Sequence, residues 1–521
     1  MLKHLYVTKI DAKQELDNIN CGGDIDRFNR MFFVARKDHL DELLDGEKYF
    51  VTGDKGTGKT AFLIYAALQA EALFTAERCF IIFQELSQEE REEYRGLAHI
   101  TKYDKDDLSP HIDYEYVWWW VFHNTIADTI LSSEKEIFVH NEALDTYLAA
   151  VHAIKTSPRS SGRKIPLITT GGYVDASVSV PLRGATINLS GKINFERSSD
   201  NPQQVRFSTY INELNRLYSN LDEGESPLYM VVDEMNLSRI NSAEYERDIF
   251  LIRDLIIAIE KFNLISKNCH DSVRIMGAIR KEVINTVSIK GKEINKAIES
   301  YGIPIDWTLF VESGLKHPLI KLLINYFRIS DSQQNLSPYS DDDKEFFRWV
   351  DPKIWGRSSE EVLRSYTLYR PRNIVRLLKL VKDHRGSDDR ITSDTMESIK
   401  RNYSTDCWNE VLEELALLYT PIELQLIREW LTGMPWKTTY ESMLTDAQIL
   451  WNKNINAQKL IANFDELMQH LFRVGVIGNI RHTPVAIEER WHFLGDEILI
   501  RRQDIIIHEI FRPVLSSVSP V

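Results

Sequence analysis

Residues 53–60 carry a sequence pattern that is suited to binding phosphate. They read Gly-Asp-Lys-Gly-Thr-Gly-Lys-Thr, which fits G-x-x-x-x-G-K-[ST] in full. Glycines let a loop curl until several N–H groups point at one cluster of oxygens, and the start of the following helix adds its positive dipole end. The pattern lies between the apolar run 49–51 and the helix-like stretch 61–68, which are the neighbours that such a loop needs.

The same loop contains side chains suited to a nucleoside triphosphate and its metal. Lys59 is expected to reach the outer phosphates, and the Thr60 hydroxyl is expected to ligate Mg²⁺. The expected phosphate-binding residues are Gly53, Asp54, Lys55, Gly56, Thr57, Gly58, Lys59 and Thr60. A glycine-rich turn that matches by chance is the competing interpretation, and the agreement of strand, loop and helix argues against it.

A second apolar run, 228–232, ends in the acids Asp233 and Glu234. A continuous apolar run is typical of a buried parallel strand, and such strands deliver the residues at their carboxyl ends to the crevice where ligands bind. We therefore expect Asp233 to hold Mg²⁺ through water and Glu234 to polarise the attacking water. Without the glycine loop, an ordinary acidic turn would be the better interpretation.

Further apolar runs predict strands near 78–83, 273–280 and 303–307. Arg280 ends the second of these runs, where it is suited to sense the γ-phosphate or to reach a neighbouring subunit. Pairing with Glu282 or Glu234 is an equally good interpretation. The tryptophan triplet 118–120 opens a predicted helix, and its apolar neighbours favour core packing over base stacking.

Helices dominate beyond residue 315, and one of them begins at Pro371. Proline suits the first turn of a helix, so Arg370 and Arg372 are expected at the N-terminal end of this helix. A helical lid packed over a nucleotide would present these cations to the phosphates. The alternative is that both are surface arginines at a helix start.

Residues 155–206 differ in character from the rest of the chain. Alternating apolar and polar residues predict a β-hairpin insertion. The insertion is basic, whereas the whole chain has a net charge of −14. Its basic residues are Lys155, Arg159, Arg163, Lys164, Arg183, Lys192, Arg197 and Arg206. This pattern is consistent with a solvent-exposed insertion that has no binding role. It is also consistent with a surface for nucleic acid or an acidic partner.

The order of these parts resembles that of the AAA+ ATPases, and in detail the prokaryotic P-loop ATPases related to origin-recognition (ORC) proteins. The residues that carry the resemblance are 50–60, 230–234, 278–280, 305–307 and 370–372. The resemblance implies an α/β fold with a RecA-like parallel-sheet core, a helical lid and a C-terminal winged helix. It also implies ATP and Mg²⁺ as cofactors, and a place in phage-defence or mobile-element loci beside an effector.

Carried over by residue, the resemblance gives catalytic roles to Lys59, Glu234, Arg280 and Arg372. It places Arg370 among the nucleotide-binding residues, and Thr60 and Asp233 at the metal. The polar sensor usual after the fourth strand is not evident, since Ala278 and Ile279 lie there, so hydrolysis is expected to be slow or partner-dependent. The expected domains are an N-terminal segment (1–45), an ATPase core (46–315), a helical lid (316–400) and a winged-helix-like domain (405–521).

The predicted winged helix contains a helix over 458–472 and a strand pair that ends near 491–493. From Val411 onward the chain has ten basic residues and fourteen acids. A DNA-binding module is expected to be basic, because neutralised phosphates supply most of the non-specific affinity. We therefore expect this domain to contact protein or to regulate the chain itself.

Composition favours a soluble, cytoplasmic protein of several domains. The chain has 521 residues of which 43% are apolar, its four cysteines form no C-x-x-C pair, and it shows neither a signal peptide nor a membrane span. The expected function is an ATP-hydrolysing, self-associating switch that controls a protein effector. A neighbour's arginine commonly completes such a site, with Arg280, Arg274 and the lid arginines as candidates. The alternatives are a DNA-engaged ORC- or loader-like ATPase that uses the basic insertion, and nucleotide binding without turnover.

Overall fold

The chain folds into two compact units. Unit 1 comprises Met1–Ala35, Gly56–Gly58 and Asp306–Val521, and unit 2 comprises Arg36–Lys55 and Lys59–Ile305. The predicted N-terminal segment 1–45 is thus divided between the units. The computed structural model describes residues 1–101, 111–156, 164–165, 173–182, 185–194, 205–237, 242–289, 292–310, 314–384, 386, 388–416, 418–452, 454–483 and 487–519.

Unit 2 is built on a five-stranded parallel sheet with the strand order β11-β1-β10-β9-β2. The strands are β1 (Phe50–Gly53), β2 (Glu77–Ile82), β9 (Leu228–Asp233), β10 (Val273–Arg280) and β11 (Gly302–Pro304). Each neighbouring pair is parallel, so the carboxyl ends of the strands meet at one edge. β1 and β9 are buried along their whole length, as their continuous apolar sequences predict. The predicted α/β class is confirmed.

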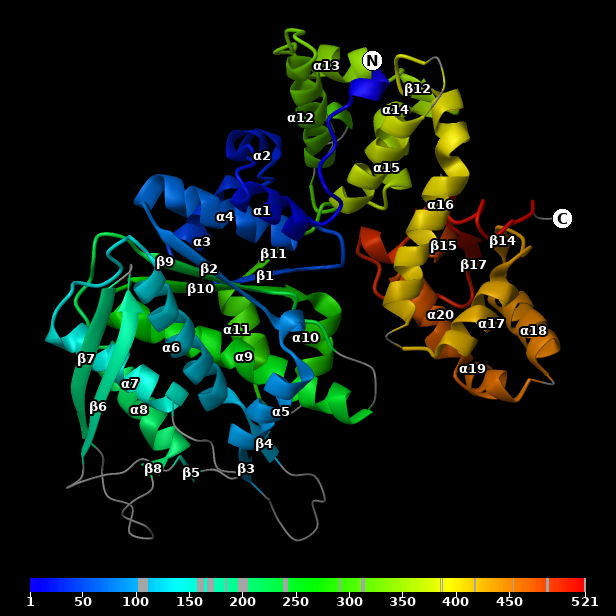
Figure 1. The fold of residues 1–521 in the computed structure, drawn as a ribbon. Coiled ribbons are helices and arrows are strands. Elements are labelled where there is room, and N and C mark those ends of the chain that lie inside the picture. The colour runs from blue at the N-terminus through cyan, green and yellow to red at the C-terminus, as the bar shows by residue number, and fades with distance from the viewer. Residues whose placement is uncertain are drawn as a thin grey trace. The chain divides into compact units, whose positions relative to one another are not determined.

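Helices cover both faces of this sheet. α4 (Lys59–Phe74) packs on β1, β9 and β10, and α9 (Ser242–Cys269) packs on β10 from the opposite face (Figure 1). The remaining helices of unit 2 are α3 (Lys37–Leu44), η2 (Phe83–Glu85), α5 (Gln88–Leu97), α6 (Glu115–Ser132), α7 (Glu142–Thr156), α8 (Phe207–Tyr218), α10 (Lys281–Val287) and α11 (Ile294–Tyr301). The short strands β3 (His99–Thr101) and β4 (His111–Asp113) form an antiparallel pair.

The tryptophan triplet lies in the core, as predicted. Trp118, Trp119 and Trp120 are all buried in the first turns of α6. The Trp118 indole N–H donates to the Leu251 carbonyl of α9 at 2.8 Å, which satisfies the one polar group of that ring. The triplet therefore fastens α6 to α9 and presents no stacking surface for bases.

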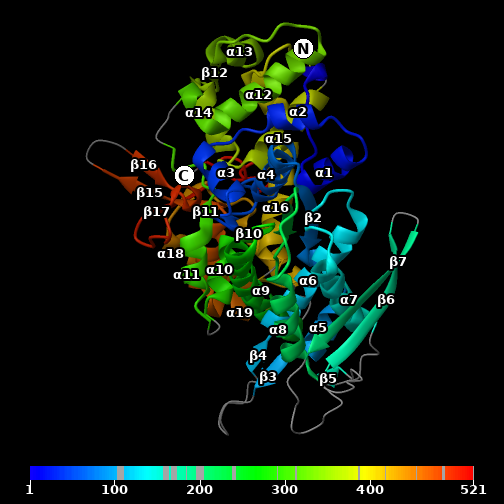
Figure 2. The ribbon, with the colours of Figure 1, turned by 90° about the vertical axis from the view of Figure 1, so that its left-hand side faces the viewer.

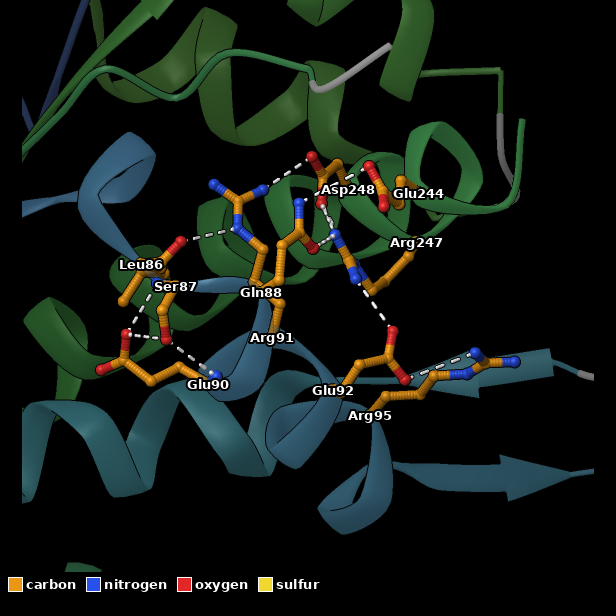
Figure 3. Close-up of polar contacts among 10 residues, drawn as sticks. All are labelled: Leu86, Ser87, Gln88, Glu90, Arg91, Glu92, Arg95, Glu244, Arg247 and Asp248. Carbon is orange, nitrogen blue, oxygen red and sulfur yellow. Dashed lines mark hydrogen bonds and ion pairs between the residues drawn. The ribbon is translucent and has the colours of Figure 1, made fainter. Parts of the chain in front are cut away.

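A buried ion-pair network fixes the start of α9 to α5 (Figure 3). Arg91 donates to Asp248 at 2.7 Å, and Arg247 donates to Glu92 at 2.9 Å and to Gln88 at 3.0 Å. Asp248 is fully buried, and the two guanidinium groups beside it offset the cost of burying its carboxylate. The acidic run 85–93 contains the start of α5, which is closed by a capping box of Ser87 and Glu90.

The insertion contains a two-stranded antiparallel hairpin of β6 (Tyr173–Leu182) and β7 (Ala185–Asn194), which confirms the predicted hairpin. The hairpin packs beside α7, and Figure 2 shows the two long strands next to that helix. A smaller pair joins β5 (Lys164–Ile165) to β8 (Val205–Arg206). Arg159, Arg163, Arg183 and Arg197 lie outside the described residues. The basic surface of the insertion therefore stays a prediction.

The first part of unit 1 is helical. Its elements are η1 (Leu2–His4), α1 (Ala12–Asn20), α2 (Ile25–Met31), η3 (Gly314–Lys316), α12 (Pro318–Gln333), α13 (Asp342–Trp349), β12 (Lys353–Ile354), β13 (Arg357–Ser358), α14 (Ser359–Tyr366), α15 (Pro371–Asp383) and α16 (Ser393–Leu415). The N-terminal segment is tied to α12, since the Tyr6 N–H donates to the Ser330 hydroxyl at 2.8 Å. α16 runs without a break through residues 400–405, where the sequence analysis divided the lid from the last domain.

The C-terminal part of unit 1 combines helices with a small sheet, as the winged-helix prediction requires. The helices are α17 (Pro421–Leu431), α18 (Tyr440–Trp451), η4 (Ile455–Ala457), α19 (Gln458–Ala462), α20 (Phe464–Arg473) and η5 (His492–Leu494). The four-stranded sheet has the order β14-β17-β15-β16 and contains β14 (Lys437–Thr438), β15 (Ile477–His482), β16 (Ile487–Arg490) and β17 (Asp504–Ile507).

The single helix predicted over 458–472 is wrong. The segment forms two helices, because Asn463 has φ −110° and ψ 34°, which ends α19 and starts α20. Apolar spacing continues across this residue, so periodicity alone could not reveal the break. Among the described residues, no helix is long and apolar enough to cross a membrane.

Candidate functional site

The glycine loop follows β1 directly and leads into α4, as the sequence predicts. Gly56 and Gly58 have φ values of 81° and 94°, which are in the left-handed region that favours glycine. Two glycines of the pattern therefore have conformations that other residues adopt at a cost. Gly56–Gly58 belong to unit 1, whereas Gly53–Lys55 and Lys59 belong to unit 2.

Lys59 is buried at the start of α4 and bonded to its own loop. Its Nζ donates to the Gly53 carbonyl at 3.0 Å and to the Asp54 carbonyl at 2.8 Å. Burial, assisted by the charge of Arg280, lowers the pKa of Lys59 from 10.5 to about 8. The ammonium group thus lies in a largely dry place, where a bound anion would stabilise its charged form.

Thr60 and Asp233 meet beside Lys59, although they are far apart in sequence. The Thr60 hydroxyl donates to the Asp233 carboxylate, and the Glu234 N–H donates to Asp233 Oδ1 at 2.7 Å. Asp233 is 6% exposed, and this burial raises its pKa in spite of those hydrogen bonds and the charge of Lys59. A hydroxyl and a carboxylate are hard oxygen ligands of the kind that Mg²⁺ prefers, so the pair fits the predicted metal site.

Glu234 follows β9 with a backbone conformation that is unusual for its type. Its φ is 55°, and a non-glycine residue in the left-handed region stores about 1–3 kcal/mol. The turn is closed by a hydrogen bond from the Asn236 N–H to the Glu234 carbonyl at 2.7 Å. Strain of this kind is common where a side chain must be aimed, which agrees with the role predicted for Glu234.

Arg280 ends β10 at the same edge of the sheet. It is in register with Gly53 of β1, the first residue of the loop. Its guanidinium lies 3.6 Å from the Glu282 carboxylate, so of the two pairings left open by the sequence the structure shows the one with Glu282. Ala278 and Ile279, which lie where a polar sensor is usual, are buried in the strand.

The two arginines of the predicted lid lie at the start of α15, where Arg370 is the N-cap residue and Pro371 is the first residue. Arg370 Nη1 lies 3.3 Å from Glu414, and Arg372 Nη1 lies 3.2 Å from Glu410. The Arg370 side chain is only 9% exposed, so it is not a surface arginine. Arg372 is 30% exposed, and its N–H donates to the Gly56 carbonyl at 3.3 Å.

Trp307 is a loop contact that the sequence analysis missed. The sequence predicts a strand over 303–307, but β11 ends at Pro304 and the Trp307 indole N–H donates to the Thr57 carbonyl at 2.9 Å. The available signal was chemical, because a buried indole N–H usually finds an acceptor. Trp307 therefore helps to hold the three loop residues of unit 1.

Arg274, the other strand arginine considered for a neighbour's site, lies near the start of β10. It pairs with Asp271 at 2.7 Å and also donates to the Leu44 carbonyl and the Tyr229 hydroxyl. The strand order places these partners at the amino edge of the sheet, away from Lys59 and Asp233. Its contacts are those of a structural residue.

Comparison with known proteins adds one finding. No family model matches the chain, and no curated protein matches it. Among solved structures, the chain is similar to Cdc6p from Pyrobaculum aerophilum, with 10% sequence identity, a TM-score of 0.32, and coverage of 95% of this chain and 96% of that one. The strand order and the elements show an α/β chain with a five-stranded parallel sheet, a helical region and a C-terminal antiparallel sheet.

Proposed function

We propose that this chain is a P-loop ATPase of the AAA+ type that binds ATP with Mg²⁺ and hydrolyses it. The observation that carries the proposal is the meeting of Lys59, Thr60 and Asp233 at the carboxyl edge of the sheet, next to the glycine loop. A cation, a hydroxyl and a carboxylate in one buried place are the groups that a metal-bound triphosphate requires.

Each residue has a distinct role in this proposal. Lys59 exchanges its bonds to the loop carbonyls for bonds to phosphate oxygens, and Thr60 and Asp233 hold Mg²⁺. When bound, Mg²⁺ neutralises charge on the phosphates. Glu234 accepts a hydrogen bond from the attacking water and so orients it. Arg280 stabilises charge that develops on the γ-phosphate, and Glu282 holds the guanidinium of Arg280 in place.

The wider role that we propose is a self-associating switch that regulates a protein effector. Support comes from the acidic C-terminal part, whose ten basic residues and fourteen acids disfavour a DNA-binding role. The family resemblance suggests anti-phage defence as its setting, and it suggests that an arginine completes the site of a neighbour.

Two substitutions test the nucleotide site. Lys59→Ala should abolish ATP binding, because Lys59 interacts with the bound ground state. Glu234→Gln should retain binding and block turnover, because Glu234 acts on the water only during the reaction. Titration with a fluorescent ATP analogue and a phosphate-release assay measure the two effects. Lys296→Ala, at a side chain that is 78% exposed, is the control and should match wild type. Equal ATP affinity in wild type and Lys59→Ala would remove the assignment.

Light scattering on the same proteins tests the switch. We expect the ATP-bound Glu234→Gln protein to be larger than the nucleotide-free protein at micromolar concentration. A strictly monomeric protein in both states would contradict self-association. Adding DNA to the phosphate-release assay tests the alternative, because stimulation by DNA would favour a DNA-engaged ATPase.

A further inference from the structure

Two buried acids lie in contact between α12 and α13 of unit 1, and we call them the carboxyl pair. They are Asp331, in the last turn of α12, and Glu345, in the first turn of α13. Both residues are 0% exposed, and their side chains are in hydrogen-bonding contact. The two helices lie side by side in both views (Figures 1 and 2). Because acids are almost never fully buried unless they are paired, the partners of these two decide their charge.

The charges around the carboxyl pair balance only if one of the two acids is neutral. Arg348, one turn after Glu345 on α13, pairs with Asp331. Arg328, a second cation on α12, is paired with Asp342 at 2.6 Å. One guanidinium against two carboxylates would leave a net negative charge in a dry place, and two like charges in contact do not both ionise readily. The balance therefore requires one proton on the carboxyl pair.

The individual oxygen atoms of the carboxyl pair indicate where this proton lies. Asp331 Oδ2 accepts from Arg348, and Glu345 Oε2 accepts from the Tyr339 N–H at 2.8 Å. The other two atoms, Asp331 Oδ1 and Glu345 Oε1, are buried, and within the described part of the chain no donor reaches either. Two buried acceptors without a donor are costly, whereas a proton on one of them makes it a donor to the other. Glu345 is the better carrier, because Asp331 has the guanidinium.

The electrostatic surroundings of Glu345 agree with a bound proton. Burial raises the pKa of Glu345, the Tyr339 N–H lowers it, the charge of Asp331 raises it and that of Arg348 lowers it, and the net shift is upward from 4.5. The folded chain thus holds this proton more tightly than the unfolded chain does. The free energy of unfolding therefore falls as the pH rises from 4.5 through the pKa of Glu345 in the folded chain.

The same residues hold the loop 334–341, which connects α12 to α13. The backbone carbonyl of Asp331 accepts from the Leu336 N–H at 2.9 Å, and Arg348 donates to a loop carbonyl at 3.3 Å. The Arg348 guanidinium also lies 4.0 Å from the centre of the Tyr339 ring. Leu336 and Tyr339 are 43% and 42% exposed, so the loop presents two large apolar side chains to solvent. The way it presents them depends on the carboxyl pair.

We propose that Asp331 and Glu345 share one proton, which the Glu345 hydroxyl donates to Asp331 Oδ1, and that loss of this proton to solvent releases the loop 334–341. The inference goes beyond the proposed function, because no residue of the nucleotide site takes part in it. When Glu345 ionises, two carboxylates face each other without a donor between them. Repulsion then moves Glu345, and with it the acceptor of the Tyr339 N–H, away from Asp331. The proton thereby couples the pH to the position of Leu336 and Tyr339.

Hydrogen–deuterium exchange of the full chain, corrected for the intrinsic exchange rate at each pH, tests the inference. In wild type we expect the amides of 334–341 to lose protection as the pH rises above 4.5, by up to about tenfold per pH unit while Glu345 titrates. Glu345→Gln supplies an amide that donates to Asp331 at every pH and a carbonyl that accepts from Tyr339. Its loop should show no pH dependence between about pH 5 and 8 and should be at least as protected as wild type at pH 8. Asp343→Asn, at an exposed carboxylate of α13, is the matched control and should keep the pH dependence of wild type.

A carboxyl pair that is fully ionised would give different results. If Glu345 is a carboxylate held by Arg348, Glu345→Gln should lower the protection of the loop at pH 8, and that result overturns the inference. Constant protection of wild type from about pH 5 to 8 also overturns it, because Glu345 then does not titrate there. Loss of protection on addition of EDTA at constant pH would show a metal ion in place of the proton, with the same consequence.

Asp331→Asn is the second variant, and it decides the question if Glu345→Gln fails to fold. Its amide can donate to Glu345 Oε1 at every pH, while Arg348 loses its partner. We expect the loop to be less protected than in wild type at about pH 5 and to lose its pH dependence. A pH dependence that persists in Asp331→Asn contradicts the shared proton, because another group must then titrate.

Discussion

Strand β10 carries one arginine near each end, and the two have opposite surroundings. Arg274, at the amino edge of the sheet, bonds to Asp271, the Leu44 carbonyl and the Tyr229 hydroxyl, and its guanidinium lies 5.5 Å from the centre of the Tyr229 ring. Arg280, at the carboxyl edge, has one ion pair of 3.6 Å with Glu282 and influences the pKa of Lys59.

The difference shows that the edge of a parallel sheet at which a residue lies decides whether it stabilises the fold or is available to a ligand. At the amino edge, loops and helix ends surround an arginine with fixed acceptors, so its donors are already occupied. At the carboxyl edge, the glycine loop, Asp233 and Glu234 converge, and a cation retains donors for a ligand. The same residue type on one strand therefore stabilises the fold at one end and is available for chemistry at the other.

The largest expected effect concerns Arg280. Arg280→Ala should lower ATP turnover about 100-fold, which is typical for loss of one group that stabilises developing charge, while the melting temperature stays near that of wild type. Phosphate release and thermal unfolding measure the two quantities. Equal turnover in Arg280→Ala and wild type would remove the distinction between the two ends of the strand.

Arg274→Ala should have the converse effect. Loss of its hydrogen bonds to charged and carbonyl groups should lower the free energy of unfolding by about 2 kcal/mol. Turnover at a temperature where the variant is folded should match wild type. Denaturant unfolding and phosphate release test this pair of expectations, and a turnover defect without a stability defect would reverse the interpretation of Arg274.

The smallest expected effect is a pH dependence at Lys59, whose pKa is lowered to about 8. A bound anion raises that pKa, so ATP affinity should be greatest below pH 8 and fall about tenfold as the pH rises from 8 to 9 or slightly beyond. Between pH 8 and 10.5 the folded chain binds fewer protons at Lys59 than the unfolded chain, so this residue makes the free energy of unfolding rise with pH in that range.

The same titration sharpens the comparison of the two arginines. Arg280 contributes to the low pKa of Lys59, so Arg280→Ala should move the fall in ATP affinity to higher pH, and Arg274→Ala should leave it in place. Lys59→Arg should flatten the curve, because a guanidinium stays charged throughout the range. Identical curves for all four proteins would show that Lys59 does not titrate there.

Local signals in the sequence were enough to predict the core of unit 2. The glycine pattern is a recognisable motif by itself. The apolar runs before Asp233 and up to Arg280 each predict a buried strand that ends in a charged residue. The structure places the strands that carry them side by side, with Thr60 bonded to Asp233. The capped start of α17 at Thr420 was predictable for the same reason, since the capping box lies within four residues.

Contacts that depend on how helices pack together could not be predicted in this way. Nothing near Arg372 in sequence indicates that Glu410 holds it, because the pairing depends on how α15 and α16 pack. The sequence also did not distinguish the surroundings of Arg274 from those of Arg280, since both belong to the same apolar run. The left-handed conformation of Glu234 depends on the turn after β9, and its residue type gave no sign of it.

The uninterrupted course of α16 has a mechanical consequence. A helix of 23 residues has a rise of about 34 Å, and it bends little over that length. It can therefore act as a lever arm. By the same geometry, a tilt of about 10° at one end of α16 displaces the other end by roughly 6 Å. A change in the contacts of Glu410 that tilts α16 would therefore produce a larger displacement at the far end of the helix.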